Sequence, residues 1–198
     1  MELLGEIIRL QIQTTSLKIG ERPHTRYDPA GIVSVPRLGL EPGGVNGFTD
    51  DGTRLNDVHH AQHPRSKSRG TNAISVLFTA HYDEIRNRFG DWLADGIAGE
   101  NILVRCDRHL SELELRSGIR IASSDGAIID LERVIVADPC VEFSRYAMRF
   151  PDDQRPDRSV TEAVQFLSDG MRGYYAIYQG APVSIRPGDL VYAASSAA

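Results

Sequence analysis

The residue best suited to chemistry in this sequence is Cys140, one of only two cysteines in the chain. It follows Pro139 at the end of the β-branched run Val134-Ile135-Val136, which predicts a strand. A thiol at a strand end is placed to react, and the thiolate is the form that reacts. The competing interpretation is a structural cysteine, since free cysteines are among the most buried residues. Charged neighbours of both signs flank the thiol, so the sequence does not show whether together they raise or lower the pKa of the thiol: Asp138, Glu142 and Arg145.

Two further stretches combine glycine with polar side chains. Gly99-Glu100-Asn101 predicts a turn that presents an acid and an amide at the start of a strand. Glu100 and Asn101 could hydrogen-bond a polar ligand or orient a neighbouring loop, unless the turn is an ordinary connection. Arg172 stands between Gly170 and Gly173, so it is displayed between two flexible positions. The alternative for Arg172 is a solvated surface arginine.

A polar insertion covers residues 41–70 and is rich in Gly, Pro, Asp, Asn and His. Long segments without periodicity are usually functional or mobile. His59 and His63 would share one helical face and could bind zinc, although Pro64 favours a loop. The insertion also carries a basic group that could grip a phosphate, with a solvated loop as the remaining alternative: Arg65, Lys67 and Arg69.

Composition narrows the class of protein. A length of 198 residues suits one domain, and 41% hydrophobic residues with 25% charged residues is typical of a folded soluble protein. A net charge of −5 gives no reason to expect nucleic acid or an anionic membrane as a partner. We find no signal-peptide pattern at residues 1–6 and no apolar run of the roughly 18 residues that a membrane span needs. We therefore expect a cytoplasmic protein with reduced thiols.

The elements that must position these residues are mostly short strands. Apolar alternation and turn residues predict strands near 9–13, 32–35, 72–78, 102–104, 119–121, 127–131, 134–137, 173–178, 183–185 and 190–192. Helices are expected from Ala80 to Phe89, with Thr79 as its cap, and from Ser159, whose capping box includes Glu162, to Gly170. We see no βαβ alternation, so a parallel sheet is not expected. The fold class predicted is mainly β, a small closed or nearly closed barrel with two or more short helices.

In this order, the three motifs resemble the MOSC family, named for the C-terminal domain of molybdenum-cofactor sulfurases. The family's elements are a Gly-Glu-Asn turn, a Pro-Cys pair after a strand, and an Arg-x-Gly-x-Tyr-like segment followed by Gly-Asp. They correspond here to Gly99–Asn101, Pro139-Cys140, Arg172–Tyr175 and Gly188-Asp189. The resemblance spans roughly residues 7–192, within a single MOSC-like domain over 1–198.

The chain departs from the family pattern at two places. The family often has Gly-Asp-Arg-His or similar before the strand at 73–78, where this chain has Gly43-Gly44-Val45-Asn46-Gly47 and the insertion. The family also often has Gly-Asp before the strand at 119–121, where this chain has Ser117-Gly118.

The resemblance implies a MOSC barrel that binds the molybdenum cofactor, molybdopterin with its metal. Cys140 would carry sulfur as a persulfide, or it would ligate molybdenum in a protein that reduces N-hydroxylated compounds. A cysteine desulfurase or an electron-transfer protein would then be the partner. The implied cofactor-binding residues are Glu100, Asn101, Arg172, Arg145, Arg65, Lys67 and Arg69.

Two alternatives bear on these implications. Pyridoxal phosphate is not expected, because it belongs to the fused desulfurase domain of family relatives and because Lys18 and Lys67 are the only lysines that could form a Schiff base. The competing class of function is a non-catalytic binding module, a MOSC barrel that has lost its cofactor contacts.

Overall fold

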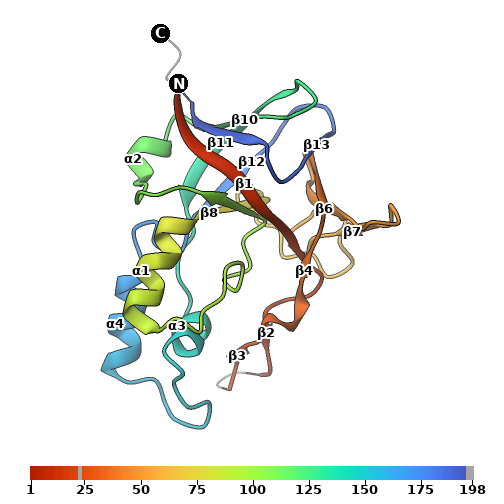
Figure 1. The fold of residues 1–198 in the computed structure, drawn as a ribbon. Helices are drawn as coiled ribbons and strands as arrows, with labels where there is room; N and C mark the ends of the chain where they lie inside the picture. Colours follow the sequence, from red (N-terminus) through yellow and green to blue (C-terminus); the bar gives the residue numbers. More distant parts are fainter. Residues whose placement is uncertain (22–23, 195–198) are drawn as a thin grey trace.

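A closed β-barrel forms the body of the protein in a computed structural model, which describes residues 1–21 and 24–194 (Figure 1). Its strands follow one another around the barrel in the order β14-β10-β11-β12-β8-β9-β1, and β14 pairs again with β1 to close it. The predicted mainly β fold with a closed barrel is therefore confirmed. The strands are β1 (Glu2–Gln13), β8 (Ile74–Phe78), β9 (Ile102–Arg105), β10 (Ile119–Ala122), β11 (Ile128–Val136), β12 (Tyr174–Ile177) and β14 (Leu190–Ala193).

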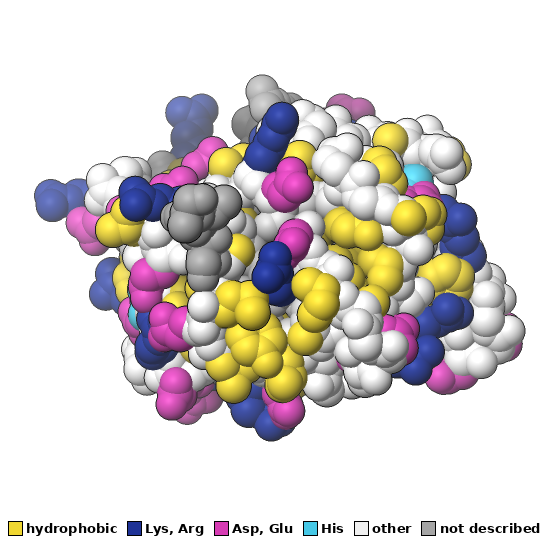
Figure 2. Space-filling model, turned by 90° about the horizontal axis from the view of Figure 1, so that it is seen from above, with side chains coloured by type: hydrophobic (Ala, Val, Ile, Leu, Met, Phe, Trp, Pro, Cys, Tyr) yellow, Lys and Arg dark blue, Asp and Glu magenta, His cyan; other side chains and the backbone are white. Residues whose placement is uncertain are grey.

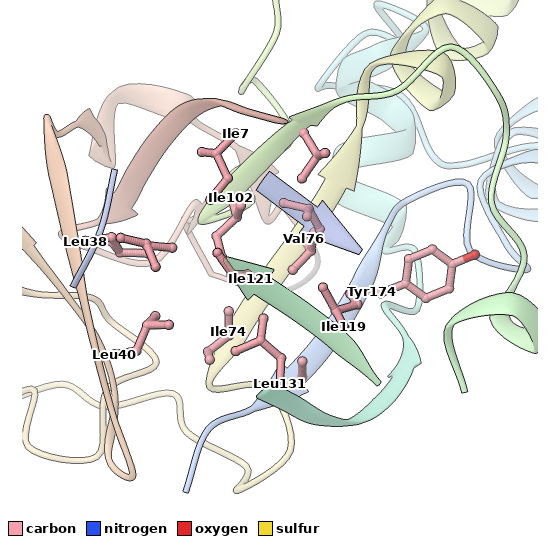
Figure 3. Packing of buried hydrophobic residues seen from close by; sticks show 14 of the residues in the cluster. Ile7, Leu38, Leu40, Ile74, Val76, Ile102, Ile119, Ile121, Leu131 and Tyr174 are labelled. Carbon is pink, nitrogen blue, oxygen red and sulfur yellow. The ribbon is translucent and has the colours of Figure 1, made fainter. Parts of the chain in front are cut away.

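Alternating apolar residues fill the barrel. Ile119 pairs with Leu131 and Ile121 with Ile129 across the β10–β11 hairpin, and all four side chains are buried. Because side chains alternate between the two faces of a strand, this register turns one face of each strand inward. Figure 3 shows Ile119, Ile121 and Leu131 gathered with Val76 of β8 around the same interior. The hairpin predicted around Asp125-Gly126 is thus confirmed.

One parallel pair interrupts the antiparallel barrel. β8 runs into helix α1 (Thr79–Phe89), and the chain returns as β9, which pairs with β8 in parallel. The expectation of no βαβ unit was wrong here, because the long connection between the strands leaves room for a crossover helix. Helix α1 lies where it was predicted, but Thr79 does not cap it. Its Oγ1 donates to the carbonyl of Cys106 at 2.8 Å, and so ties the helix start to the end of β9.

A small second sheet packs against the barrel and occupies much of the predicted insertion. It consists of β13 (Val183–Ile185), β5 (Arg37–Glu41), β6 (Gly44–Phe48) and β7 (Arg54–Asn56). The expectation of an irregular segment over 41–70 was therefore wrong for its first part. Glycine interrupts the alternation of apolar and polar side chains in this segment, so the strands were not predicted from the sequence. It is also required at Gly47, where a Cβ would lie 2.8 Å from Cγ1 of Val35.

The remaining elements gather at one end of the barrel. Figure 1 places α1, α3 (Val141–Ala147) and α4 (Arg158–Phe166) there, near the hairpin of β2 (Lys18–Ile19) and β3 (Arg26–Tyr27). Their apolar faces form a second cluster of buried residues around Tyr82 and Phe143. The cap of α4 is Asp157 rather than the predicted Ser159, and α3 was not predicted. Three short elements complete the fold: 3-10 helix η1 (Pro29–Gly31), β4 (Ile32–Ser34) and α2 (Glu112–Leu115).

The outer surface bears on the classes of partner. Seen from above, basic and acidic side chains are intermixed with hydrophobic ones on the visible face, and neither sign dominates it (Figure 2). Among the described residues, none of the helices combines the length and the apolar character that crossing a membrane requires.

Candidate functional site

The loop over residues 96–101 is the centre of the candidate site. It carries the Gly99-Glu100-Asn101 motif, and side chains from separate parts of the chain bind its backbone. Because the anchors come from β1, β3, α1 and the segment before β12, the loop is fixed relative to the barrel and to the helical end at once. The contacts are Gln11 Nε2 to the Gly96 carbonyl at 2.7 Å, Tyr27 Oη to that of Ile97 at 2.7 Å, Arg172 Nη2 to that of Ala98, Gln13 Nε2 to that of Gly99 at 2.6 Å, and the Ala98 N–H to Tyr82 Oη at 3.0 Å.

The side chain of Asn101 is committed to the protein itself. Its Oδ1 accepts from both the N–H and the hydroxyl of Ser75, each at 2.9 Å. Its Nδ2 donates to the Gln11 carbonyl at 3.2 Å and to Oδ2 of Asp57 at 3.0 Å. An amide has two donors and two acceptor lone pairs, so all four hydrogen-bonding positions are used. Asn101 therefore positions the loop.

Glu100 differs from Asn101 because its carboxyl group is only half satisfied. The residue is 2% exposed, its Oε2 accepts from Tyr82 Oη at 3.0 Å, and its buried Oε1 has no partner among the described residues. Burial raises the pKa of Glu100, while its own backbone N–H, the charge of Arg172 and the Tyr82 hydroxyl act in the opposite direction. A buried carboxyl oxygen without a partner is costly, and such groups occur at functional sites.

Arg172 is held inside the site and is not a freely solvated surface residue. Its guanidinium donates to the Ala98 carbonyl and stacks 4.4 Å from the ring centroid of Phe143. Burial acts to lower the pKa of Arg172, but the nearby Tyr27, Tyr175 and Cys140 groups raise it overall. Arg172 therefore supplies a fixed positive charge between the loop and Cys140.

Cys140 lies at the start of α3 and is partly exposed. Its Sγ accepts a hydrogen bond from the Phe143 N–H at 3.4 Å, and its carbonyl accepts from the N–H of Ser144 at 3.0 Å. The other cysteine, Cys106, is buried, and its Sγ contacts the carbonyl of Arg108. Of the two thiols, the one that the sequence singled out is therefore the accessible one.

The partner of Cys140 that sequence reasoning missed is Lys18. Its Nζ lies 3.1 Å from Oε2 of Glu142, the second residue after Cys140. Burial acts to lower the pKa of Lys18, but the charges of Cys140 and Glu142 raise it overall. Burial likewise acts to raise the pKa of Glu142, and its own backbone N–H, Lys18 and the Cys140 thiol lower it. A cation and the carboxylate that pairs with it thus stand beside the thiol.

The other predicted basic residues lie elsewhere. Arg145 is buried and points to the segment after α3, where its Nη2 donates to the carbonyls of Pro151 at 2.6 Å and Gln154 at 3.2 Å. The three basic residues of the insertion have exposed side chains on the loop after β7, and among the described residues no hydrogen bond or ion pair joins them to Cys140: Arg65, Lys67 and Arg69.

A buried Asp–His pair joins that loop to the site, and sequence reasoning missed it too. Asp57 is fully buried, with Oδ1 at 2.9 Å from His59 Nδ1 and Oδ2 accepting from the N–H of Gln13 at 2.7 Å as well as from Asn101. Asp57 and His59 are two residues apart in the sequence. Asp and His have the same spacing in the Gly-Asp-Arg-His pattern that we did not find before the strand at 73–78. Among the described residues, no group of three or more His, Cys, Asp or Glu side chains is placed to hold a metal ion. His59 and His63, which the sequence offered as zinc ligands, therefore belong to no such group.

Comparison with known proteins identifies the family. The MOSC domain model matches residues 56–192, a range that begins beside Asp57 and contains Cys140. The crystal structure of APC1665, the YUAD protein from Bacillus subtilis, superposes with a TM-score of 0.53 and 18% identity, covering 96% of this chain and 93% of that chain. A hypothetical protein superposes with a TM-score of 0.54 and 12% identity, covering 98% and 68%. At these identities the two structures show a shared fold only, and no curated protein matches the chain. Since the family match covers well over half of its residues, the chain belongs to the MOSC domain family.

Proposed function

We propose that this protein handles the molybdenum cofactor through the Cys140 thiol. The single observation that carries the proposal is the placement of that thiol: it is partly exposed, Glu142 and Lys18 lie beside it, and the fixed charge of Arg172 is close. Thiolate sulfur is a soft ligand and a good acceptor of sulfur, so the residues fit a soft metal or a persulfide. When bound, the cofactor would supply a redox-active metal with room for a sulfur ligand.

The residues divide the work in this proposal. Lys18 stabilises the negative charge of the Cys140 thiolate, and Glu142 holds the ammonium of Lys18 beside it. Arg172 holds a second positive charge where an anionic group of the cofactor can bind. Glu100 offers its unpartnered Oε1 to a donor on the ligand. Asn101 contributes by fixing the loop that presents Glu100.

Two forms of this function use the same thiol. As a sulfur carrier, Cys140 Sγ would bond to the terminal sulfur of a cysteine persulfide on a desulfurase, and the desulfurase cysteine would leave as a thiolate. As a metal ligand, the thiolate would bind molybdenum in a protein that reduces N-hydroxylated compounds, with electrons from a partner protein. We expect Arg65, Lys67 and Arg69 to reach a phosphate of the cofactor if their loop folds over the site.

The deciding experiment is to purify the protein from a host that makes molybdenum cofactor and to measure bound molybdenum and pterin. Cys140→Ser should lose the metal, whereas Cys106→Ser, which alters the buried thiol, should keep it. Incubation with a cysteine desulfurase and cysteine tests the carrier form, since a persulfide on Cys140 adds roughly 32 Da. Absence of metal, pterin and added sulfur in the wild type would leave the binding-module alternative in its place.

A further inference from the structure

A pocket of about 540 Å³ lies between α3 and the chain around β3. Its volume is within the range of small-molecule sites. Aromatic rings form much of its wall, and Trp92 and Tyr146 contact each other with centroids 5.1 Å apart. Tyr27 and Phe150 also line it. Such a wall suits a flat apolar ring, because aromatic pairs gain energy beyond the burial of their area.

Two of the three arginines that line the pocket, Arg145 and Arg149, have no counter-charge. Arg145 is only 6% exposed, and its buried Nε finds no acceptor among the described residues. The guanidinium of Arg149 stacks 4.5 Å from the ring centroid of Trp92. The part of the chain that the structure describes places no carboxylate at ion-pair distance from either arginine. A buried guanidinium without an anion is costly, which points to an anionic ligand.

The acids that line the same pocket do have partners. Glu142 pairs with Lys18 at 3.1 Å, and Asp152 lies 3.9 Å from Arg26. Asp28 accepts a hydrogen bond from the N–H of Ala30 at 2.9 Å. Asp28 has no cationic partner among the described residues, so two arginines without an ion pair stand against one such carboxylate, and the excess of unpaired charge in the pocket is positive.

We propose that this pocket binds a small aromatic anion such as an aromatic carboxylate. Its ring would pack against Trp92 and Tyr146, and its anionic group would bind between Arg145 and Arg149. Glu142 lines the pocket and also interacts with the Cys140 thiol, so the ligand lies next to the reactive sulfur. That this ligand is a substrate of the thiol chemistry rests on the proposed function, whereas the existence of the site does not.

Trp92 is the single tryptophan of the chain, so its fluorescence reports on this pocket directly. The probes are benzoate, the neutral benzamide and the non-aromatic cyclohexanecarboxylate, titrated into the purified protein. Benzoate should give a saturable change, and the other two should bind at least about tenfold more weakly, since charge-assisted hydrogen bonds and ring stacking are each worth a factor of that order. Equal binding of benzamide, or no saturable change with benzoate, would overturn the proposal.

Three variants locate the site. Arg145→Gln and Arg149→Asn should each weaken benzoate binding about tenfold. Arg149 is exposed and has a φ of 53°, which asparagine tolerates, so this variant keeps the test valid if Arg145→Gln does not fold. The matched control is Arg88→Gln, whose guanidinium stacks on Phe166 outside the pocket, and it should bind as the wild type does. If Arg88→Gln lost benzoate binding while the Arg145 and Arg149 variants kept it, the assignment of the ligand to this pocket would be refuted.

A last measurement separates this site from the proposed function. Benzoate should bind Cys140→Ser with unchanged affinity, because the thiol does not line the pocket. In the wild type it should slow alkylation of Cys140 by iodoacetamide. Binding without protection would refute the placement beside the thiol but keep the pocket. Protection without bound molybdenum would keep the pocket and remove the cofactor chemistry.

Discussion

Replacing Asn101 by alanine should destabilise the fold by about 3–7 kcal/mol, because this buried side chain makes four hydrogen bonds. Three of them are between neutral groups and contribute roughly 0.5–1.5 kcal/mol each. The fourth reaches the buried carboxylate of Asp57, and a bond to a charged group contributes roughly 1.5–3 kcal/mol. For a domain of this length the loss corresponds to a fall in Tm of roughly 6–28 °C.

The matched control is Asn72→Ala. Asn72 is also buried, at 6% exposure, but its side chain bonds only within its own loop, accepting from the N–H of Arg69 and donating to the carbonyl of Lys67. We expect a loss of about 1–2 kcal/mol, since these two contacts link residues close in sequence. Both variants are compared by urea denaturation and thermal unfolding. If Asn101→Ala cost no more than Asn72→Ala, the side chain would not be fixing the loop, and its role as a ligand contact would become the better explanation.

Three further predictions concern ionisable groups near the site. In a Cys106→Ser background, Lys18→Met should slow alkylation of Cys140 at neutral pH by roughly two- to fivefold. The factor is modest because solvent screens the charge of a half-exposed lysine, and an unchanged rate would contradict an interaction between Lys18 and the thiolate. Burial and then the charge of a neighbouring histidine lower the pKa of His81 to about 4. As the pH falls, this histidine is therefore protonated in the unfolded chain before it is protonated in the folded protein, and the free energy of unfolding should drop by about 3 kcal/mol between pH 6.5 and 4. His81→Gln should reduce this dependence on pH when stability is measured by urea titration. Glu100→Gln should raise the free energy of unfolding at pH 7 by about 1–2 kcal/mol, because it removes a buried charge with an unpartnered oxygen, and a loss of stability would argue against that reading.

Local pattern was enough to predict the barrel strands but not the small sheet. β10 and β11 could be predicted because buried residues such as Ile119 and Ile121 alternate with exposed ones around a strong turn. β6 could not, because its core-facing positions are Val45 and Gly47, and the lack of a side chain at Gly47 is what lets the sheet approach the barrel. Helix α3 was missed because only four residues, Pro139 among them, separate the end of β11 at Val136 from the start of the helix at Val141, and proline after a strand is typical of a loop.

The candidate site was predictable where one motif supplies the chemistry and not where tertiary contacts decide it. Cys140 and Glu100 stand out by residue type and by their place after a strand or glycine. Lys18 does not, because more than a hundred residues separate it from the thiol that it faces. Arg145 is only five residues from Cys140, yet the helix turns it away to bind the carbonyl of Pro151. Nearness along a helix therefore says little about which charge a reactive group meets.

Tyr27 connects the two halves of the site. Its hydroxyl donates to the carbonyl of Ile97 at 2.7 Å, and so binds the loop that carries Glu100. Its ring packs edge-on against Phe143 of α3 at 5.1 Å, and that same ring supports the guanidinium of Arg172. Because burial raises the pKa of Tyr27, the hydroxyl stays neutral and remains a donor. The loop is fixed to the barrel by many hydrogen bonds, whereas Cys140 lies on a short helix held largely by aromatic packing. Tyr27, which belongs to neither motif, therefore links the position of the thiol to that of the acid and the arginine.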